Sequence, residues 1–145
     1  MDNLSSDQNY IDYIQFIVIG NLEQAKISLK NSIEVMQNKE NINIDTLSYL
    51  YQKLGSLIYL KGDEKQAIEL YDLSIKVANE SLISKLLYAK FLINECKKYQ
   101  LAINMCNSII ESATNTPYPE SETDFSSEHY LNQAKELINE CESII

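Results

Sequence analysis

Residues 51–78 read YQKLGSLIYLKGDEKQAIELYDLSIKVA, and this stretch decides the fold. Its second half carries small or apolar side chains at a spacing of three or four residues, which places them on one face of an α-helix. These residues are Ala67, Ile68, Tyr71, Ser74, Ile75 and Ala78. Before them, Gly62 suits the left-handed backbone that closes a helix, and Asp63-x-x-Gln66 has the form of a capping box that opens the next one. The stretch therefore predicts an antiparallel helix pair over about 44–61 and 63–79.

The same stripe occurs twice more along the chain. Shifted forward by 35 residues, it becomes Ala102, Ile103, Cys106, Ile109, Ile110 and Ala113. Shifted back by 42 residues, it becomes Ala25, Leu29, Ser32, Ile33 and Met36, with Lys26 in place of an apolar residue. Each stripe follows another apolar segment, and Gly20-Asn21 marks the first joint as Gly62-Asp63 marks the second. We expect three helix pairs as repeats over about 7–37, 44–79 and 81–113, with individual helices at 7–19, 21–37, 81–96 and 99–113.

The last part of the chain differs from the repeats. Residues 114–125 are polar and acidic and contain both prolines, which predicts an exposed loop. A seventh helix is predicted over 126–145, with Ser126 as its N-cap and with Phe125 and Tyr130 as a hydrophobic staple. Its apolar stripe is Leu131, Ala134, Leu137, Ile138, Cys141, Ile144 and Ile145. Such a helix caps the open end of a stack, and the 145 residues then form a single all-α domain, 1–145.

Composition limits the functions that the chain can have. Its formal net charge is −9, and from Glu111 onward eight acidic residues face one lysine, which gives −7 for that part. Such a field repels nucleic-acid backbones and anionic bilayers and attracts basic partners. The longest apolar run without charge, residues 13–22, is too short to cross a membrane, and no secretory signal is evident. We therefore expect a cytoplasmic protein that binds neither nucleic acid nor membranes.

The side chains needed for catalysis are scarce. The chain has one histidine, no arginine and three cysteines without C-x-x-C spacing, so neither a metal site nor a disulfide framework is indicated. We interpret His129 as an exposed residue of a first helical turn, and Cys106 and Cys141 as small core residues. Cys96 lies beside Lys97 and Lys98, which would lower the pKa of a thiol, but it has no partner base. The sequence predicts no enzyme, no cofactor and no metal.

The segment Tyr51-x2-Leu54-Gly55-x2-Ile58, followed by Ala67-x3-Tyr71, resembles the tetratricopeptide repeat (TPR). The resemblance covers about residues 7–113. The third repeat keeps Tyr88-Ala89-x2-Leu92 and Ala102, but its loop at Lys97 and Lys98 is one residue longer and Cys106 replaces the second aromatic residue. In the first repeat, Asp12-Tyr13 stand where Leu-Gly is usual. The resemblance implies a right-handed superhelix of three helix pairs with a capping helix, in which Gly55 and Ala67 mark the close contact within a pair.

The resemblance also implies a function. Tetratricopeptide proteins are binding modules whose concave face, lined by the first helix of each pair, receives a peptide or a helix. Carried over by position, this groove would be lined by Tyr10, Ile14, Ile17, Tyr49, Gln52, Lys53, Ser56, Tyr59, Ile83, Leu86, Leu87 and Lys90. The clamp of basic and amide residues that one subgroup uses for acidic C-termini is absent, because apolar or neutral residues such as Ile14, Ser56 and Leu86 stand in its place.

Three functions fit these features. The first is an adaptor that binds a protein or peptide partner in the groove. The second is a dedicated secretion chaperone, since type III translocator chaperones look like three such repeats and dimerise through an N-terminal segment. The apolar surface of helix 7–19 would then form a homodimer. The third is an immunity-type protein whose acidic C-terminal part neutralises a basic toxin.

Overall fold

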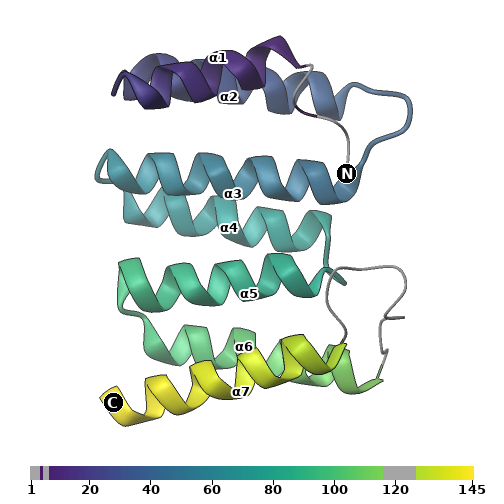
Figure 1. Ribbon diagram of the computed structural model, residues 1–145, viewed down its shortest axis with the longest axis vertical. Coiled ribbons are helices and arrows are strands. Elements are labelled where there is room, and N and C mark those ends of the chain that lie inside the picture. Colours follow the sequence, from purple (N-terminus) through teal and green to yellow (C-terminus); the bar gives the residue numbers. More distant parts are fainter. Residues whose placement is uncertain (1–3, 5–6, 116–126) are drawn as a thin grey trace. The chain divides into compact units, whose positions relative to one another are not determined.

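The computed structural model describes residue 4 and residues 7–115 and 127–145 (Figure 1). Within them the chain forms seven α-helices: α1 (Gln8–Val18), α2 (Leu22–Gln37), α3 (Ile44–Leu60), α4 (Glu64–Val77), α5 (Leu82–Phe91), α6 (Tyr99–Asn115) and α7 (Ser127–Ile144). One π-helical turn, η2 (Leu92–Cys96), follows α5, and the described residues contain no strand. The predicted all-α fold class is confirmed, and the helix bounds lie within two residues of those expected from the sequence except at the end of α5. That helix was expected to reach residue 96 but ends at Phe91, where η2 begins.

Side-chain caps explain why the helix starts could be predicted. Before each of α1 to α5, the side chain of the preceding residue accepts a hydrogen bond from a backbone N–H in the first turn. These caps are Asp7, Asn21, Asn43, Asp63 and Ser81. Of the predicted capping box, the N-cap half is formed, since Gln66 N donates to Asp63 Oδ1 over 3.0 Å, while Asp63 N donates to Ile58 O. The proposed N-cap Ser126 and staple residue Phe125 lie outside the described residues.

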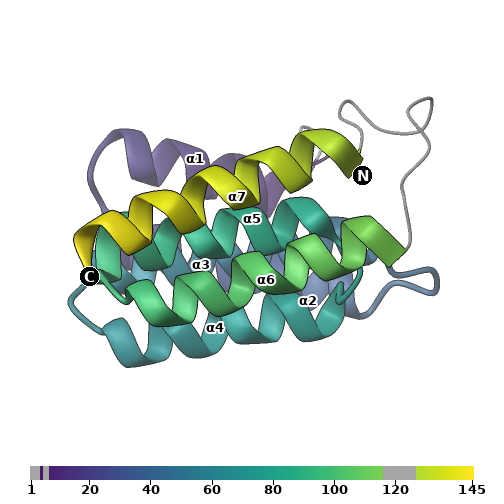
Figure 2. The same ribbon diagram turned by 90° about the horizontal axis from the view of Figure 1, so that it is seen from below.

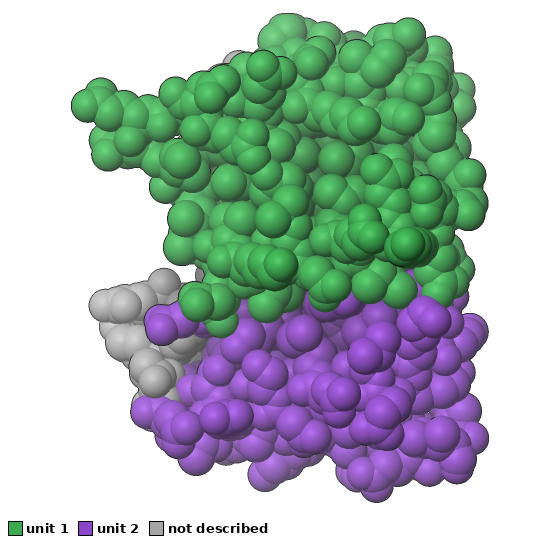
Figure 3. Space-filling view, turned by 180° about the vertical axis from the view of Figure 1, so that it is seen from behind, with its two compact units in different colours: residues 1–79 green, residues 80–145 purple. Residues whose placement is uncertain are grey.

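The chain divides into two compact units, unit 1 (Met1–Asn79) and unit 2 (Glu80–Ile145), which Figure 3 colours green and purple. In unit 1, α1 packs against α2, α2 against α3, and α3 against α4. In unit 2, α5 packs against α6, and α7 packs against both, so that it lies along them in Figure 2. This pairwise packing is the packing that a helical superhelix requires. The hand of such a superhelix and the single domain stay predictions.

The helices α3 and α4 approach each other closely at Gly55. A Cβ atom added at Gly55 would lie 2.9 Å from Tyr71 Cδ2 and 3.1 Å from the carbonyl oxygen of Ala67. The Tyr71 ring cannot easily move away, because its hydroxyl hydrogen-bonds Ser56 Oγ at 2.7 Å and the residue is buried. The predicted role of Gly55 and Ala67 as the small residues of this contact agrees with this geometry.

The turn after α3 is closed by a backbone bond that recurs in all three pairs. Asp63 N donates to Ile58 O over 3.2 Å, and Asn21 N donates to Phe16 O over 2.9 Å, while Gly62 and Gly20 adopt φ of +98° and +78°. In the third pair, Lys98 N donates to Leu92 O over 2.9 Å across one more residue. The same closing bond is therefore kept around a longer segment.

The longer loop expected at Lys97 and Lys98 is in fact a wider helical turn. The extra residue is absorbed in η2, because a π-helical turn holds one residue more than an α-helical turn. Lys97 then occupies the left-handed position that Gly62 holds in the second pair, with φ +57°. Its side chain gains one bond there, from Nζ to the carbonyl oxygen of Asn94 at 3.0 Å.

Replacing Lys97 by glycine should stabilise the protein. A side chain in the left-handed region costs roughly 1–2 kcal/mol, and the greater freedom of glycine in the unfolded chain offsets part of the gain. We expect Lys97→Gly to raise the free energy of unfolding by about 0.5–1 kcal/mol and Gly62→Ala to lower it by about 1 kcal/mol. Urea denaturation of both variants measures this pair of opposite effects. A Lys97→Gly variant that is less stable than the unmodified chain would show that the left-handed backbone of Lys97 is not strained.

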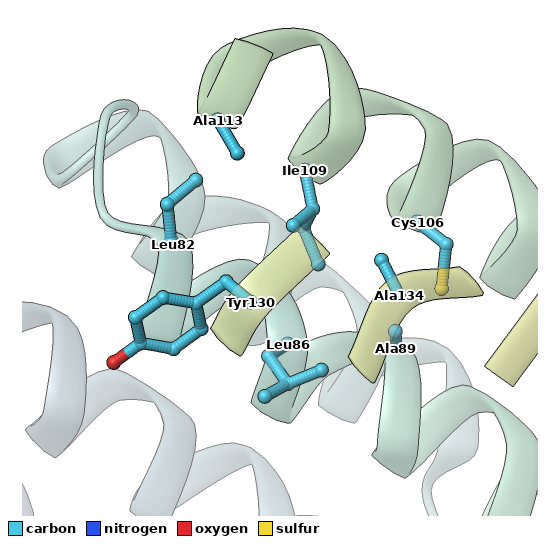
Figure 4. Close-up of a cluster of buried hydrophobic side chains, with 8 residues drawn as sticks. All are labelled: Leu82, Leu86, Ala89, Cys106, Ile109, Ala113, Tyr130 and Ala134. Atoms are coloured by element: carbon cyan, nitrogen blue, oxygen red, sulfur yellow. The ribbon is translucent and has the colours of Figure 1, made fainter. Parts of the chain in front are cut away.

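The core of unit 2 is the contact of α7 with α5 and α6 (Figure 4). It consists of Leu82, Leu86, Ala89, Cys106, Ile109, Ala113, Tyr130 and Ala134. Leu131, Leu137 and Ile138 of the predicted α7 stripe pack against it, whereas Ile144 and Ile145 are exposed, because they lie at the last turn beyond this contact. Burial raises the pKa of the Cys106 thiol to about 11 and also raises the pKa of Cys141, which suits thiols that act as small apolar groups.

Candidate partner-binding surface

Three of the predicted groove residues come together on unit 1. The hydroxyls of Tyr10 in α1 and Tyr49 in α3 form a hydrogen bond of 2.9 Å, with ring centroids 6.4 Å apart. Lys53 follows Tyr49 by one helical turn, and its Nζ lies 5.2 Å from the centroid of the Tyr49 ring, within cation–π range. We call Tyr10, Tyr49 and Lys53 the tyrosine–lysine cluster. All three side chains are half-buried, so each keeps some surface for a partner.

The electrostatics of the tyrosine–lysine cluster are simple. Burial raises the pKa of Tyr49, and its hydrogen bond to Tyr10 raises it further. Burial also raises the pKa of Tyr13, whose ring centroid is 5.6 Å from that of Tyr10. Tyr13 and Tyr49 therefore stay neutral at physiological pH. Of the two bonded hydroxyls, the one that accepts still has its own proton to donate to a ligand.

The other predicted residues of unit 1 surround this cluster unevenly. Ile14 is exposed, while Ile17 and Tyr59 are half-buried. Ser56 is half-buried, and its hydroxyl is engaged with Tyr71 inside the pair. The predicted surface of unit 1 is thus mainly aromatic and aliphatic, and Lys53 is its one predicted charged member.

Gln52 and Leu86 do not lie on a surface, which corrects the sequence prediction for these two positions. Gln52 is 4% exposed, and its Nε2 donates to Ser74 Oγ over 3.1 Å. Leu86 is 3% exposed and packs in the core of unit 2. The two residues are equivalent by the offset of 34 residues between the first helices of the second and third pairs. The second helices of these pairs differ by 35 residues, because the third pair has one residue more before its second helix. The position of Gln52 and Leu86 turns inward in both pairs because it faces the second helix of its own pair.

The polarity of this inward position differs between the pairs. In the second pair, Ser48 Oγ donates to the carbonyl oxygen of Ser74 over 3.0 Å, so that Ser48, Gln52 and Ser74 form a buried hydrogen-bonded group. In the third pair, the equivalent residues are Leu82, Leu86 and Ile109, which α7 covers. Each group is internally consistent, since buried polar atoms need partners and buried aliphatic side chains need close packing.

On unit 2, the remaining predicted residues lie along α5. Ile83 and Leu87 are exposed and Lys90 is half-buried, at a spacing of four and three residues that places them on one face. Like the surface of unit 1, this face combines aliphatic side chains with a lysine and has no acidic member among the predicted residues.

Two exposed residues that the sequence analysis did not select are Val18 in α1 and Leu60 in α3. They are equivalent by the offset of 42 residues, but the repeat alignment shows only this equivalence and not that both side chains are exposed. Tyr13 was also missed as a neighbour of the tyrosine–lysine cluster. It stands where the second pair has Gly55, and it is the buried residue of α1.

Within residues 7–115 and 127–145, no three side chains of the types His, Cys, Asp and Glu gather as metal ligands. In the same part of the chain, no helix has the length and apolarity needed to cross a bilayer. His129 is half-buried, and its ring stands edge-on to Tyr130 at 5.3 Å between centroids.

Comparison with models of known protein families and with curated proteins finds no match to this chain.

Proposed function

We propose that the chain is a non-catalytic interaction module of the tetratricopeptide type, an adaptor that binds a protein or peptide partner through its first helices. The observation that carries the proposal is the tyrosine–lysine cluster of unit 1. It joins a hydroxyl pair, two aromatic rings and one cation on an otherwise apolar surface. Tyrosines of this kind supply large contact areas at low entropic cost and are frequent in binding hot spots.

Charge indicates the kind of segment that this surface accepts. Lys53 is the charged residue among those predicted on unit 1, and Lys90 is the charged residue among those predicted on unit 2. A basic segment would be repelled there, so an apolar segment that is neutral or weakly acidic fits best. The proposal of a toxin-neutralising protein would instead depend on acidic residues such as Glu120, Glu122 and Asp124, which lie outside the described residues.

A cytoplasmic location suits this proposal. Cys106 and Cys141 form no disulfide, and both are buried in unit 2. Free cysteines persist in reducing compartments.

The test is a comparison of partner capture by matched variants. The unmodified chain is used as bait in an extract of its own cells, and bound proteins are identified by mass spectrometry. The affinity of each recovered partner is then measured by calorimetry for Tyr49→Ala/Lys53→Ala and for the control Leu73→Ala/Lys76→Ala, two exposed residues on α4. We expect the first variant to bind about thirtyfold more weakly or worse, because truncated hot spots cost about 2 kcal/mol or more.

The control should bind like the unmodified chain. Equal binding by both variants would contradict the proposed surface. Tyr49→Phe separates two roles of the tyrosine, since it keeps the ring and removes the hydroxyl that bonds Tyr10. A Tyr49→Ala/Lys53→Ala variant whose thermal midpoint falls strongly would show instead that these residues belong to the core.

A further inference from the structure

Three of the most exposed large aliphatic side chains lie at one end of unit 1. Val18 is 79% exposed, Ile19 71% and Leu60 66%. Val18 and Leu60 end α1 and α3, just before the turns at Gly20 and Gly62. An ion pair between Lys61 Nζ and Glu23 joins the end of α3 to the start of α2, so the two turns lie side by side (Figure 1). We call Val18, Ile19 and Leu60 the turn edge.

The fold does not need apolar residues at the turn edge. At these exposures the three side chains add little to the core of unit 1. The third pair carries Asn94 and Glu95 at the position equivalent to Leu60, and both are exposed at its π-helical turn. A helix pair of this kind therefore closes its turn equally well with polar residues there. The aliphatic side chains of the turn edge point to a contact outside unit 1.

The charges beside the turn edge indicate the kind of surface that it contacts. Glu23 lies 3.4 Å from Lys26 Nζ and also pairs with Lys61, so both signs occur next to the aliphatic residues. Around the two turns, residues 20–26 and 60–66 hold three lysines and three acidic residues, whereas the whole chain carries −9. A two-fold contact places the same surface on both sides, and it therefore needs mixed charges and little net charge. This end of unit 1 meets that condition within an acidic chain.

We infer that the turn edge is a self-association surface that pairs with the turn edge of a second copy of this chain. The aliphatic side chains pack against those of the partner, and Glu23 exchanges bonds with the lysines of either copy. Three side chains are few compared with the 20–30 residues that each partner contributes to a standard interface. The dimer is therefore weak, with dissociation in the micromolar range rather than permanent association. This contact is separate from the tyrosine–lysine cluster.

Sedimentation velocity across the micromolar range tests this inference on the full chain. The unmodified chain should change from monomer to dimer as its concentration rises. Val18→Glu/Leu60→Glu should stay monomeric at every concentration, because it places four carboxylates in the two-fold contact. The control Leu101→Glu/Ile144→Glu changes two exposed aliphatic residues of unit 2 outside the predicted binding surface and should dimerise like the unmodified chain.

Two results would overturn the inference: a monomeric unmodified chain at all concentrations, or a dimer that the Val18→Glu/Leu60→Glu variant still forms. If that variant fails to fold, Val18→Ser/Leu60→Ser repeats the test without added charge. Partner binding through Tyr49 and Lys53 should be equal for monomer and dimer. Failure of the self-association and failure of the proposed function can therefore be told apart.

Discussion

Replacing Ala67 by leucine should destabilise the protein by about 1–3 kcal/mol, because it inserts a branched side chain at the closest contact of α3 and α4. Ala67 is fully buried, and its carbonyl oxygen would lie 3.1 Å from a Cβ atom at Gly55. The Tyr71 ring fills the space beside Gly55 and is tied to Ser56. The helices must therefore separate to admit the leucine, and the packing around them is lost.

Urea denaturation of Ala67→Leu measures this cost. The matched control is Glu69→Leu, an exposed substitution on the same helix, which should change the free energy of unfolding by less than about 0.5 kcal/mol. Gly55→Leu should repeat the effect of Ala67→Leu from the other side of the contact. If the denaturation midpoint of Ala67→Leu equals that of the unmodified chain, Ala67 does not lie at a close helix crossing.

Truncating Leu86 to alanine should cost about 2–5 kcal/mol, whereas truncating its neighbour Leu87 should cost less than about 1 kcal/mol. Leu86 is 3% exposed and packs with Ile109 and Tyr130, so its removal leaves a cavity between α5, α6 and α7. Leu87 is 40% exposed, so much of its side chain is already in water. Both variants shorten a leucine to alanine at adjacent positions of α5. They differ in whether that leucine faces the core or the solvent.

Thermal and chemical denaturation of the two variants give the comparison directly. For partner affinity the ranking of the two variants should be reversed. Leu87→Ala should weaken binding more than Leu86→Ala if the α5 face contributes to the surface. Similar stability losses for Leu86→Ala and Leu87→Ala would mean that α5 is rotated relative to the described helix. The same comparison can be made on α3 with Gln52→Ala and Lys53→Ala, where Gln52 is the buried member.

Much of the fold could be predicted because the signals were local. Helix starts depend on a cap within four residues, and the predicted cap Asp63 accepts its bond from Gln66 N. The turns at Gly20 and Gly62 depend on backbone conformations that glycine adopts without strain. The equivalence of the repeats followed from constant offsets, whereas the close contact of Gly55 with Ala67 was expected from the resemblance to the tetratricopeptide repeat.

The candidate surface was harder to predict, because residues point in all directions around a helix and the spacing alone does not show which of them face solvent. Periodicity places Tyr49, Gln52 and Lys53 on neighbouring sides of one helix, separated by about 100° per residue. Which of them faces water depends on the position of the packed neighbour. Gln52 is buried and donates a hydrogen bond to Ser74, whereas Tyr49 forms a hydrogen bond with Tyr10, which is 39 residues away in the sequence. The extra residue of the third pair likewise became a π-helical turn in place of a longer loop.

By itself, the sequence determined that the chain is helical, and it placed the helix bounds within two residues except at the end of α5. These features depend on caps, glycines and spacings, which act over a few residues and need no distant partner. Only the tertiary structure decided that Leu86 is a core residue, that Tyr10 and Tyr49 share a hydrogen bond, and that Val18 and Leu60 stay in water. The physical reason is that burial and long-range contacts are set by how neighbouring helices dock, and docking depends on all their side chains together.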